Sequence, residues 1–336
     1  MLVSIVINNY NYADFIAQAI ESALVQTHPD VEVIVVDDGS RDHSMEVIHR
    51  YSDAVRVVAQ ANGGQGSAYN AGFQNSRGKL VLFLDADDWL YPEAAAELAA
   101  AWSAGVSKLQ FRLDMVGRLG QPLGRQLPRD LHEGRIAHDL MRDFGTYGSP
   151  PGSGNAYDVD FLRQVLPLDP LRWRIGADSV PILLAPAFGG VVSVHRSLGA
   201  YRIHRDPDDG GLLYNNTVRG LAAECARIEA AKRMVLEGLD RAGVSPRRPL
   251  LLAPWEARIV TMARRFGETD LVVKLASEPQ SRTWFLLRSV WGWTVASVFR
   301  RVLISGWVLA VGFLPAPLAL RVARLHRRAS GIPVTA

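Results

Sequence analysis

The 336-residue chain has little of what would indicate a secreted protein or a thiolate metal site. Cys225 is the single cysteine, so an internal disulfide and a thiolate cluster are both excluded, which fits a reducing compartment. The N-terminus has no basic segment ahead of an apolar one, so we expect no signal peptide. Charged and apolar residues occur in ordinary globular proportions, and the length predicts one large domain with an appendage.

Acidic residues are missing from one part of the chain. Residues 282–336 carry eight arginines and no Asp or Glu, whereas the other 281 residues have a net charge of −5. Four of the eight tryptophans also lie in this tail: Trp284, Trp291, Trp293 and Trp307. A tail rich in Arg, Trp and apolar residues on an otherwise acidic protein predicts contact with a membrane surface and no binding of nucleic acid.

One stretch of the tail lacks charge altogether. Residues 302–320 are 19 residues without a charged side chain, which is about the minimum for a helix that crosses a bilayer. Pro315 and Pro317 interrupt this stretch, Gly306 and Gly312 weaken it, and arginines flank both ends. We therefore expect it to lie in one leaflet at least as readily as to cross the membrane, and a packed helical hairpin in a soluble protein remains an alternative.

The first hundred residues alternate between short apolar segments and amphipathic ones. Strands are predicted at residues 3–7, 33–36, 55–59 and 80–84, and each is followed by a helical pattern. This alternation predicts a parallel sheet with helices on both faces.

Polar side chains follow three of these strands. Asn8 begins an Asn-rich turn after the first strand, Asp38 follows the second, and Asp85, Asp87 and Asp88 follow the fourth. Open α/β sheets bind ligands at the carboxyl ends of their strands. Three carboxylates within four residues are tolerated when solvated, or when a divalent cation lies between them and a phosphate. An acidic turn that caps the next helix is the plainer alternative, and both stay open.

Four motifs, in this order and spacing, resemble the family 2 glycosyltransferases with a GT-A fold. They are VSIVINNYNY, SALVQTHPDVEVIVVDDGSRDHS, NGGQGSAYNAGF and GKLVLFLDADDWL, and they cover about residues 1–100. Two later segments continue the likeness, at residues 154–162 and at Ala177-Asp178 with residues 201–204. The resemblance implies an α/β fold with a Rossmann-like, mostly parallel sheet flanked by helices.

We expect four regions along the chain. The first two would be a nucleotide-sugar-binding half at residues 1–105 and an acceptor-binding half at 106–215. A helical extension would follow at 216–281, and the basic, Trp-rich tail at 282–336 would form membrane-associating helices. Within the acceptor half, residues 105–150 are rich in Gly, Arg and Pro, so we expect a variable, partly mobile segment without catalytic residues.

The resemblance also implies a donor site, formed by Asn8, Tyr10, Asp38, Asn62, Gly66, Asp85 and Ala86. In this site Asp38 would accept an N–H from a uracil-like base, and Asp85 would reach the ribose hydroxyls. Asp87, with His204 as an additional ligand, would hold Mg²⁺ or Mn²⁺ against the diphosphate.

Structural roles compete with several of these assignments. Asp38 could stabilise a left-handed Gly39, and residues 62–67 could form a plain surface turn. Asp88 is expected to cap the helix or support the site instead of binding the metal. His204 could be an ordinary polar residue at a strand end, and Arg202 and Arg205 could either pair with phosphate or remain solvated.

Asp178 is the candidate catalytic base. The resemblance implies an inverting displacement in which a carboxylate deprotonates the acceptor hydroxyl. Asp178 corresponds to the second position of the family's Glu-Asp pair, although Ala177 replaces the Glu. The alternative is that Asp178 caps a helix that begins at Ser179. Asn155 and Tyr157 would contact the acceptor.

We therefore expect a metal-dependent, inverting glycosyltransferase at the cytoplasmic face of the cell membrane. Its donor would be a nucleotide sugar, with the acid near the base favouring uridine, and its acceptor a lipid-linked sugar or polysaccharide. A nucleotidyltransferase that forms sugar nucleotides is disfavoured because the turn at residues 8–12 has no Gly, Lys or Arg for a triphosphate. The same turn lacks the G-x-G-x-x-G of NAD-binding enzymes. A non-catalytic nucleotide-sugar-binding protein remains an alternative.

Overall fold

The computed structural model describes residues 1–204, 221–266 and 282–330. The chain divides into two compact units. The first holds Met1–His138 and Tyr147–Arg202, and the second holds Asp139–Thr146 and the chain from Ile203 onward. The expected donor-binding half and acceptor-binding half share one sheet, which ends at Arg202 within the first unit.

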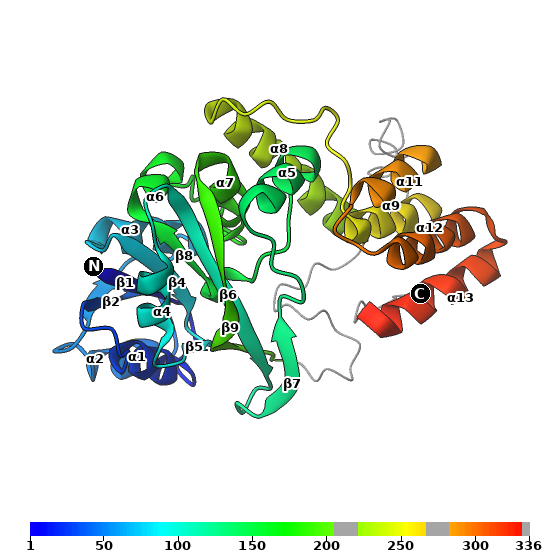
Figure 1. Cartoon of the computed structure of the whole chain (residues 1–336). Coiled ribbons are helices and arrows are strands. Elements are labelled where there is room, and N and C mark those ends of the chain that lie inside the picture. Colours follow the sequence, from blue (N-terminus) through cyan, green and yellow to red (C-terminus); the bar gives the residue numbers. More distant parts are fainter. Residues whose placement is uncertain (205–220, 267–281, 331–336) are drawn as a thin grey trace. The chain divides into compact units, whose positions relative to one another are not determined.

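The first half of the sheet is parallel, as predicted (Figure 1). Its strands lie in the order β3 (Arg56–Ala59), β2 (Val31–Asp37), β1 (Val3–Asn9) and β4 (Leu80–Asp85). β1 and β4 are buried along almost their whole length because their apolar runs face helices on both sides of the sheet. The helices between and after these strands also match the predicted alternation: α1 (Ile16–Leu24), α2 (Ser44–His49), α3 (Gln65–Asn75) and α4 (Ala94–Ala101).

The second half of the sheet is mixed, which corrects the expectation of a mostly parallel sheet. β8 (Asn155–Asp158) is antiparallel to both β4 and β6 (Val106–Val116). β6 is parallel to β9 (Gly190–Arg202), whereas β5 (Trp89–Leu90) and β7 (Pro122–Leu127) pair antiparallel with β9 and β6.

Residues 105–150 contain three regular elements that the sequence did not predict, whereas the expected mobility of the segment is untested. The elements are β6, β7 and α5 (Gly134–Phe144). Leu109, Phe111, Leu113 and Met115 alternate along β6, and all four are buried. This period of two is the pattern of a strand, but the polar residues between them and the surrounding Gly and Arg obscured it.

Three short elements complete the first unit near the site. They are the 3₁₀ turn η1 (Gly152–Gly154), α6 (Val159–Val165) and α7 (Ser179–Phe188). α7 begins directly after Asp178, as the sequence predicted.

The second unit is helical in its described part. Its elements are the end of α5 from Asp139, α8 (Leu221–Arg241), α9 (Pro254–Phe266), α11 (Thr283–Gly292), α12 (Val298–Phe313) and α13 (Ala316–Ser330). α12 packs against α9, α11 and α13. The predicted charge-free stretch 302–320 is therefore split between two helices, which meet at Leu314 and Pro315. Among the residues that the structure describes, no helix is both long and apolar enough to cross a membrane.

Candidate active site

The polar ends of three neighbouring strands lie side by side. Asn8 of β1 pairs in register with Asp85 of β4. The backbone N–H of Ala86 donates to the Asn8 carbonyl at 3.2 Å, and that of Asp38 donates to the Asn9 carbonyl at 2.9 Å. Donor-site candidates that are up to 78 positions apart in the chain therefore share the carboxyl edge of the parallel strands, where the topology predicts a ligand.

Asn8 has an unusual side chain for a strand end. Neither its Nδ2 nor its Oδ1 has a hydrogen-bond partner among the described residues, and both atoms are buried. A buried amide without partners costs about 1–3 kcal/mol per group. A bound ligand is one of the partners that could offset this cost, so the observation is compatible with the donor-site role expected for Asn8.

The acidic turn after β4 concentrates carboxylates in a buried place. Asp87 is 5% exposed and Asp88 is 1% exposed. Burial raises the pKa of Asp85 well above its usual range, and the charges of Asp87 and Asp178 raise it further. Burial likewise raises the pKa of Asp88, with Asp87 and Asp85 adding to the effect. The buried surroundings therefore disfavour the charged forms of Asp85 and Asp88, and the neighbouring carboxylates repel them further.

Asp88 supports the turn instead of facing a ligand, as expected. Its Oδ2 accepts a hydrogen bond from Ser153 Oγ at 2.6 Å, and its Oδ1 accepts one from the Arg202 N–H at 2.9 Å. Ser153 Oγ also accepts the N–H of Asp85 at 3.1 Å. Ser153 of η1 thus braces both ends of the acidic turn, a role that no local sequence signal indicated.

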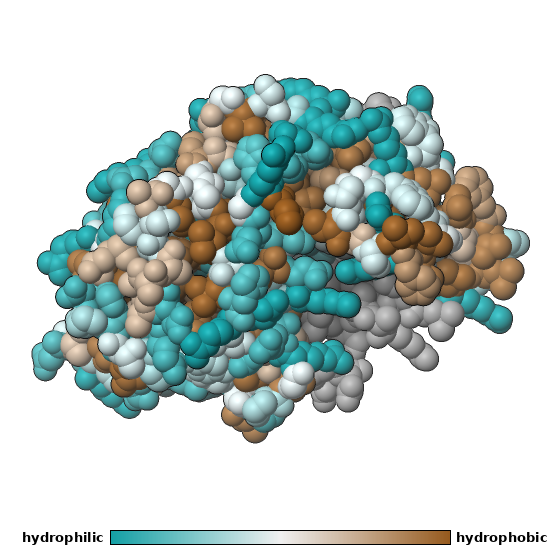
Figure 2. Space-filling view, in the orientation of Figure 1, coloured by the Kyte–Doolittle hydropathy of each residue, from teal (hydrophilic) through white to brown (hydrophobic). Residues whose placement is uncertain are grey.

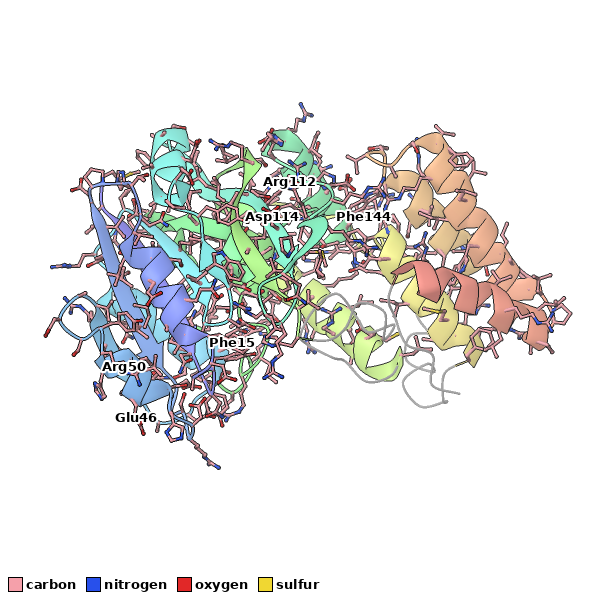
Figure 3. The ribbon with its side chains drawn as sticks, turned by 90° about the horizontal axis from the view of Figure 1, so that it is seen from below. Phe15, Glu46, Arg50, Arg112, Asp114 and Phe144 are labelled. Carbon is pink, nitrogen blue, oxygen red and sulfur yellow. The ribbon has the colours of Figure 1, made fainter. Side chains whose placement is uncertain are left out.

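Arg202 is buried and contacts the acidic turn, so the solvated alternative is wrong, and pairing with phosphate stays a prediction. Its Nε donates to the Asp87 carbonyl at 2.8 Å. Its guanidinium lies 4.7 Å from the ring of Phe15, labelled in Figure 3, and 4.9 Å from the ring of Trp89. Burial lowers the pKa of Arg202, and the charges of Asp87 and Asp88 oppose that change. Arg202 therefore supplies positive charge close to the acids.

Asp38 organises the loop after β3. Its carboxylate accepts hydrogen bonds from Gln60 Nε2 at 2.6 Å and from the N–H groups of Gly63 and Gly64 at 2.8 and 2.7 Å. Asn62 Nδ2 adds a fourth, at 3.2 Å. A carboxylate has about four acceptor positions, so these contacts give Asp38 a structural role. Its contact with a nucleotide base stays a prediction.

Gly64 and Gly66 permit a close approach by another part of the chain. A Cβ on Gly64, whose φ is +85°, would lie 2.6 Å from the Arg174 carbonyl oxygen, and one on Gly66 would lie 2.7 Å from that of Trp173. Those carbonyls accept the N–H groups of Gln65 and Gly66, both at 2.9 Å. The Arg174 side chain donates to Asn62 Oδ1. The glycines thus serve the packing of residues 173–174, and an approach of the nucleotide to this loop stays a prediction.

Asp178 lies in the same cluster as the strand-end acids. It occupies the N-cap position of α7, but its side chain makes no capping hydrogen bond. Its charge raises the pKa of Asp85 and contributes to the raised pKa of buried Tyr69. A Cβ on Gly152 of η1 would lie 3.5 Å from Asp178 Cβ, so η1 packs directly on this residue. The fold therefore brings Asp178 to Asp85 across 93 positions of sequence.

Asn155 and Tyr157, expected at the acceptor, are buried in β8. Asn155 Oδ1 accepts a hydrogen bond from the buried Lys108 Nζ at 3.0 Å, and Asn155 Nδ2 donates to the Pro151 carbonyl at 2.8 Å. The Tyr157 hydroxyl is buried without a partner among the described residues. Asn155 therefore holds the segment that leads to η1, and a contact of either residue with an acceptor remains untested.

Of the two tyrosines in the Asn-rich turn, Tyr12 lies near the acids, whereas Tyr10 faces solvent. Tyr10 is 41% exposed. Burial raises the pKa of Tyr12, and the charges of Asp87, Asp85 and Asp88 raise it further, which places Tyr12 beside the acids. Sequence reasoning missed Tyr12 because the two tyrosines stand in equivalent settings of the same turn.

The two remaining candidates lie outside the first unit. His204 belongs to the second unit, whose later segment starts at Ile203, and its role as a metal ligand stays a prediction. Arg205 lies outside the described residues.

The acids after β4 do not form a complete cation site by themselves. Within residues 1–204, 221–266 and 282–330, no group of three or more His, Cys, Asp or Glu side chains is arranged to hold a metal ion by itself. Mg²⁺, however, usually binds through one or two carboxylates together with substrate phosphates. Asp85 and Asp87, whose charges repel each other, match this arrangement, whereas both oxygens of Asp88 accept hydrogen bonds from the chain. Binding of a cation here stays a prediction.

Comparison with known proteins agrees with this geometry. Residues 4–144 match the model described as glycosyl transferase family 2. The uncharacterized glycosyltransferase alr2836 of Nostoc is 36% identical over 215 residues, covering 61% of this chain and 65% of that protein. The chondroitin synthase of Pasteurella multocida is 43% identical over 96 residues, covering 28% of this chain and 10% of the synthase. The chain thus spans less than two thirds of either relative.

The fold has a solved counterpart. S. aureus TarS 1-349, solved in complex with UDP, superposes with a TM-score of 0.53 at 16% identity, covering 98% of this chain and 89% of that one. A second structure, in complex with UDP-GlcNAc, gives a TM-score of 0.54. At this identity the likeness shows a shared GT-A-type α/β fold.

Proposed function

We propose that this chain moves a sugar from a nucleotide-sugar donor to a hydroxyl of an acceptor, because residues 4–144 match the glycosyl transferase family 2 model. One observation carries the proposal: Asp178 and the acids after β4 converge at the carboxyl edge of the parallel strands. A site for group transfer needs a donor position and a base close together.

The donor would lie across the ends of β1, β2 and β4. The unpartnered amide of Asn8 offers both a donor and an acceptor of hydrogen bonds to the nucleotide. Asp85 would accept hydrogen bonds from the ribose hydroxyls. TarS, whose fold this chain shares, was solved with UDP and with UDP-GlcNAc. This supports a uridine diphosphate sugar as the donor.

Asp87 would hold Mg²⁺ or Mn²⁺. When bound, the ion would neutralise the charge of the diphosphate leaving group. The chain's own contribution is to fix Asp87. Arg202 holds its carbonyl, and Ser153 holds the neighbouring Asp88.

Asp178 would act as the general base. Its carboxylate would take the proton of the acceptor hydroxyl while the acceptor oxygen bonds to the anomeric carbon. The bond from that carbon to the diphosphate oxygen would break, and its electron pair would leave with the nucleoside diphosphate. Attack from the face opposite the leaving group would invert the anomeric configuration.

The acceptor would be a lipid-linked sugar or a polysaccharide at the cytoplasmic face of the membrane. The support for this class is the composition of residues 282–336, with eight arginines, four tryptophans and no acid. An enzyme that modifies a lipid-linked substrate gains from such a tail because it raises the local concentration of both partners.

The test is nucleotide release by the purified full-length chain from UDP-, dTDP- and GDP-sugars, with Mn²⁺ or with EDTA. We expect release from one donor, its loss in EDTA and its loss in Asp87→Asn. The exposed Asp53→Asn serves as a matched control and should keep the activity. If calorimetry with Mn²⁺ shows no binding of any of these nucleotide sugars, the proposed donor site is wrong.

A further inference from the structure

Helix α12 is apolar on two opposite faces. Its inner face carries Ile304, Val308 and Val311, which are buried. Its opposite face carries a second apolar row, which we name the outer stripe: Phe299, Val302, Leu303, Leu309 and Phe313. Phe299, Val302, Leu309 and Phe313 follow one another at intervals of 3, 7 and 4 residues, which are close to one or two helical turns. Leu303 lies four residues after Phe299, so all five share one side of the helix.

The described residues leave most of the outer stripe uncovered. Phe299 is 73% exposed and Phe313 is 70% exposed. Hydrophobic side chains gather over the α12 end of the molecule in Figure 2. Large exposed apolar patches on soluble proteins mark surfaces that bind a partner or a membrane.

The charges around the stripe are of one sign. Arg288, Arg300 and Arg321 are exposed, and residues 282–336 contain no Asp or Glu. A second copy of this chain would bring arginines against arginines at this face, which disfavours self-association through it. An anionic surface would instead meet complementary charge.

Two tryptophans beside α12 complete the pattern. Trp284 and Trp291 are about half exposed, with Arg288 5.8 Å from the first ring and Arg301 5.3 Å from the second. Trp rings and long Arg side chains are the residues that occupy the boundary between headgroups and acyl chains.

We propose that the outer stripe of α12 docks on a bilayer that contains anionic lipids, with the helix lying in the plane of the interface. Phe299 and Phe313 enter the acyl boundary, and the arginines pair with lipid phosphates. This docking rests on the proposed function, in which the chain acts at a membrane, and it assigns the outer stripe as the face that binds. Binding itself needs no turnover, so it can be measured whether or not the enzyme is active.

The test is co-sedimentation of the full-length chain with vesicles of phosphatidylglycerol and phosphatidylcholine, and with vesicles of phosphatidylcholine alone. We expect binding to the anionic vesicles that weakens as salt is added. Phe299→Ser/Phe313→Ser should bind at least about tenfold more weakly. Arg288→Gln/Arg300→Gln should lose about tenfold or more, on anionic vesicles only.

The matched control is Leu119→Ser/Leu171→Ser, which removes two apolar side chains that are each 91% exposed in the first unit. This variant should bind as the unaltered chain does. Thermal unfolding of each variant checks that it is folded. We expect unfolding temperatures close to that of the unaltered chain, because substitutions of exposed side chains usually cost little stability.

Three results would overturn the inference. One is that the unaltered chain does not bind anionic vesicles. Another is that the stripe variant binds as well as the control. The third is a dimer in light scattering that only the stripe variant disrupts, which would assign the face to a second copy. A failure of the proposed function would appear separately, as absent nucleotide-sugar binding in solution.

Discussion

At the scale of single residues, the surroundings of each acid decide its role. Asp38 follows β2 and Asp178 precedes α7. For each of them the sequence allowed a purely structural role as the alternative to a role in the site. Asp38 accepts four hydrogen bonds from one loop. Asp178 occupies a cap position without making the capping bond, and its charge acts on Asp85. The same residue type is therefore used to hold a loop in one place and to face the site in the other.

We predict that Asp178→Asn lowers the rate of sugar transfer about 10²- to 10⁴-fold, because the amide cannot accept the acceptor's proton. The affinity for the donor, measured by calorimetry, should change little. Unaltered transfer kinetics in this variant would exclude Asp178 as the base.

We predict that Asp38→Asn destabilises the first unit by about 2 kcal/mol, because an amide offers one acceptor oxygen to donors that the carboxylate satisfies with two. Urea denaturation of the variant measures the loss. Asp53→Asn, which changes an exposed aspartate, is the control and should unfold at the same urea concentration as the unaltered chain.

At the scale of elements, the segment before α7 is fastened to the N-terminus of α3. Gln65 Oε1 accepts the N–H of Ala177 at 2.9 Å, and the carbonyls of residues 173 and 174 accept N–H groups from the first turn of α3. This junction connects the loop held by Asp38 to the residue next to Asp178.

Glycine substitutions can isolate the importance of that junction. Gly64 and Gly105 have similar φ angles, +85° and +88°, but a Cβ would clash with Arg174 at Gly64 and meet nothing within 4 Å at Gly105. Gly105→Ala should cost about 1 kcal/mol for the left-handed conformation alone. Gly64→Ala should cost at least about 1 kcal/mol more, as measured by denaturation. Equal losses would mean that the segment carrying Arg174 moves aside freely.

The edge between β1 and β2 predicts a pH effect. Burial acts to raise the pKa of Glu32, but hydrogen bonds from Ser4 and Arg77 outweigh it and lower that pKa. A lowered pKa in the folded state stabilises the protein above the unfolded value, near 4.3, and the gain is lost as pH falls through the folded value. Glu32→Gln should therefore cost about 1 kcal/mol at pH 7 after solvent screening.

The measurement is the stability of Glu32→Gln and of the unaltered chain between pH 7 and pH 3. The difference between them should shrink as the pH falls below about 4. A difference that stays constant over this range would show that the carboxylate charge contributes nothing.

At the scale of the whole molecule, the two units have separate cores. The second unit contains a buried ion pair, Lys232 to Glu256 at 2.8 Å, and Lys232 also donates to the carbonyls of Phe144 and Leu251. The first unit holds its own buried cluster on β1, β4 and β6.

We predict that Lys232→Met destabilises the second unit by about 3–5 kcal/mol, because Glu256 is left buried without its cation. Hydrogen exchange should accelerate in α8 and α9 while β1 and β4 keep their protection. Equal acceleration in β1 and β4 would show that the two units unfold together.

The sequence by itself determined the local features of this protein. Short unbroken apolar runs placed the four parallel strands, a period of 3.6 placed the helices after them, and the polar residues at the strand ends indicated the site. These signals are short-range, since each depends on residues within one or two turns of its neighbours. The mixed half of the sheet was missed because the alternation along β6 stands among polar residues and glycines.

The tertiary structure alone decided which distant residues meet. Ser153 and Arg202 brace an acidic turn that lies 65 and 114 positions from them, and Asn155 is drawn into the core by Lys108. It also decided that α12 has a second, exposed apolar face. These contacts depend on how β8, β9 and the helices are arranged in space. Composition and periodicity cannot predict that arrangement because they describe each segment in isolation.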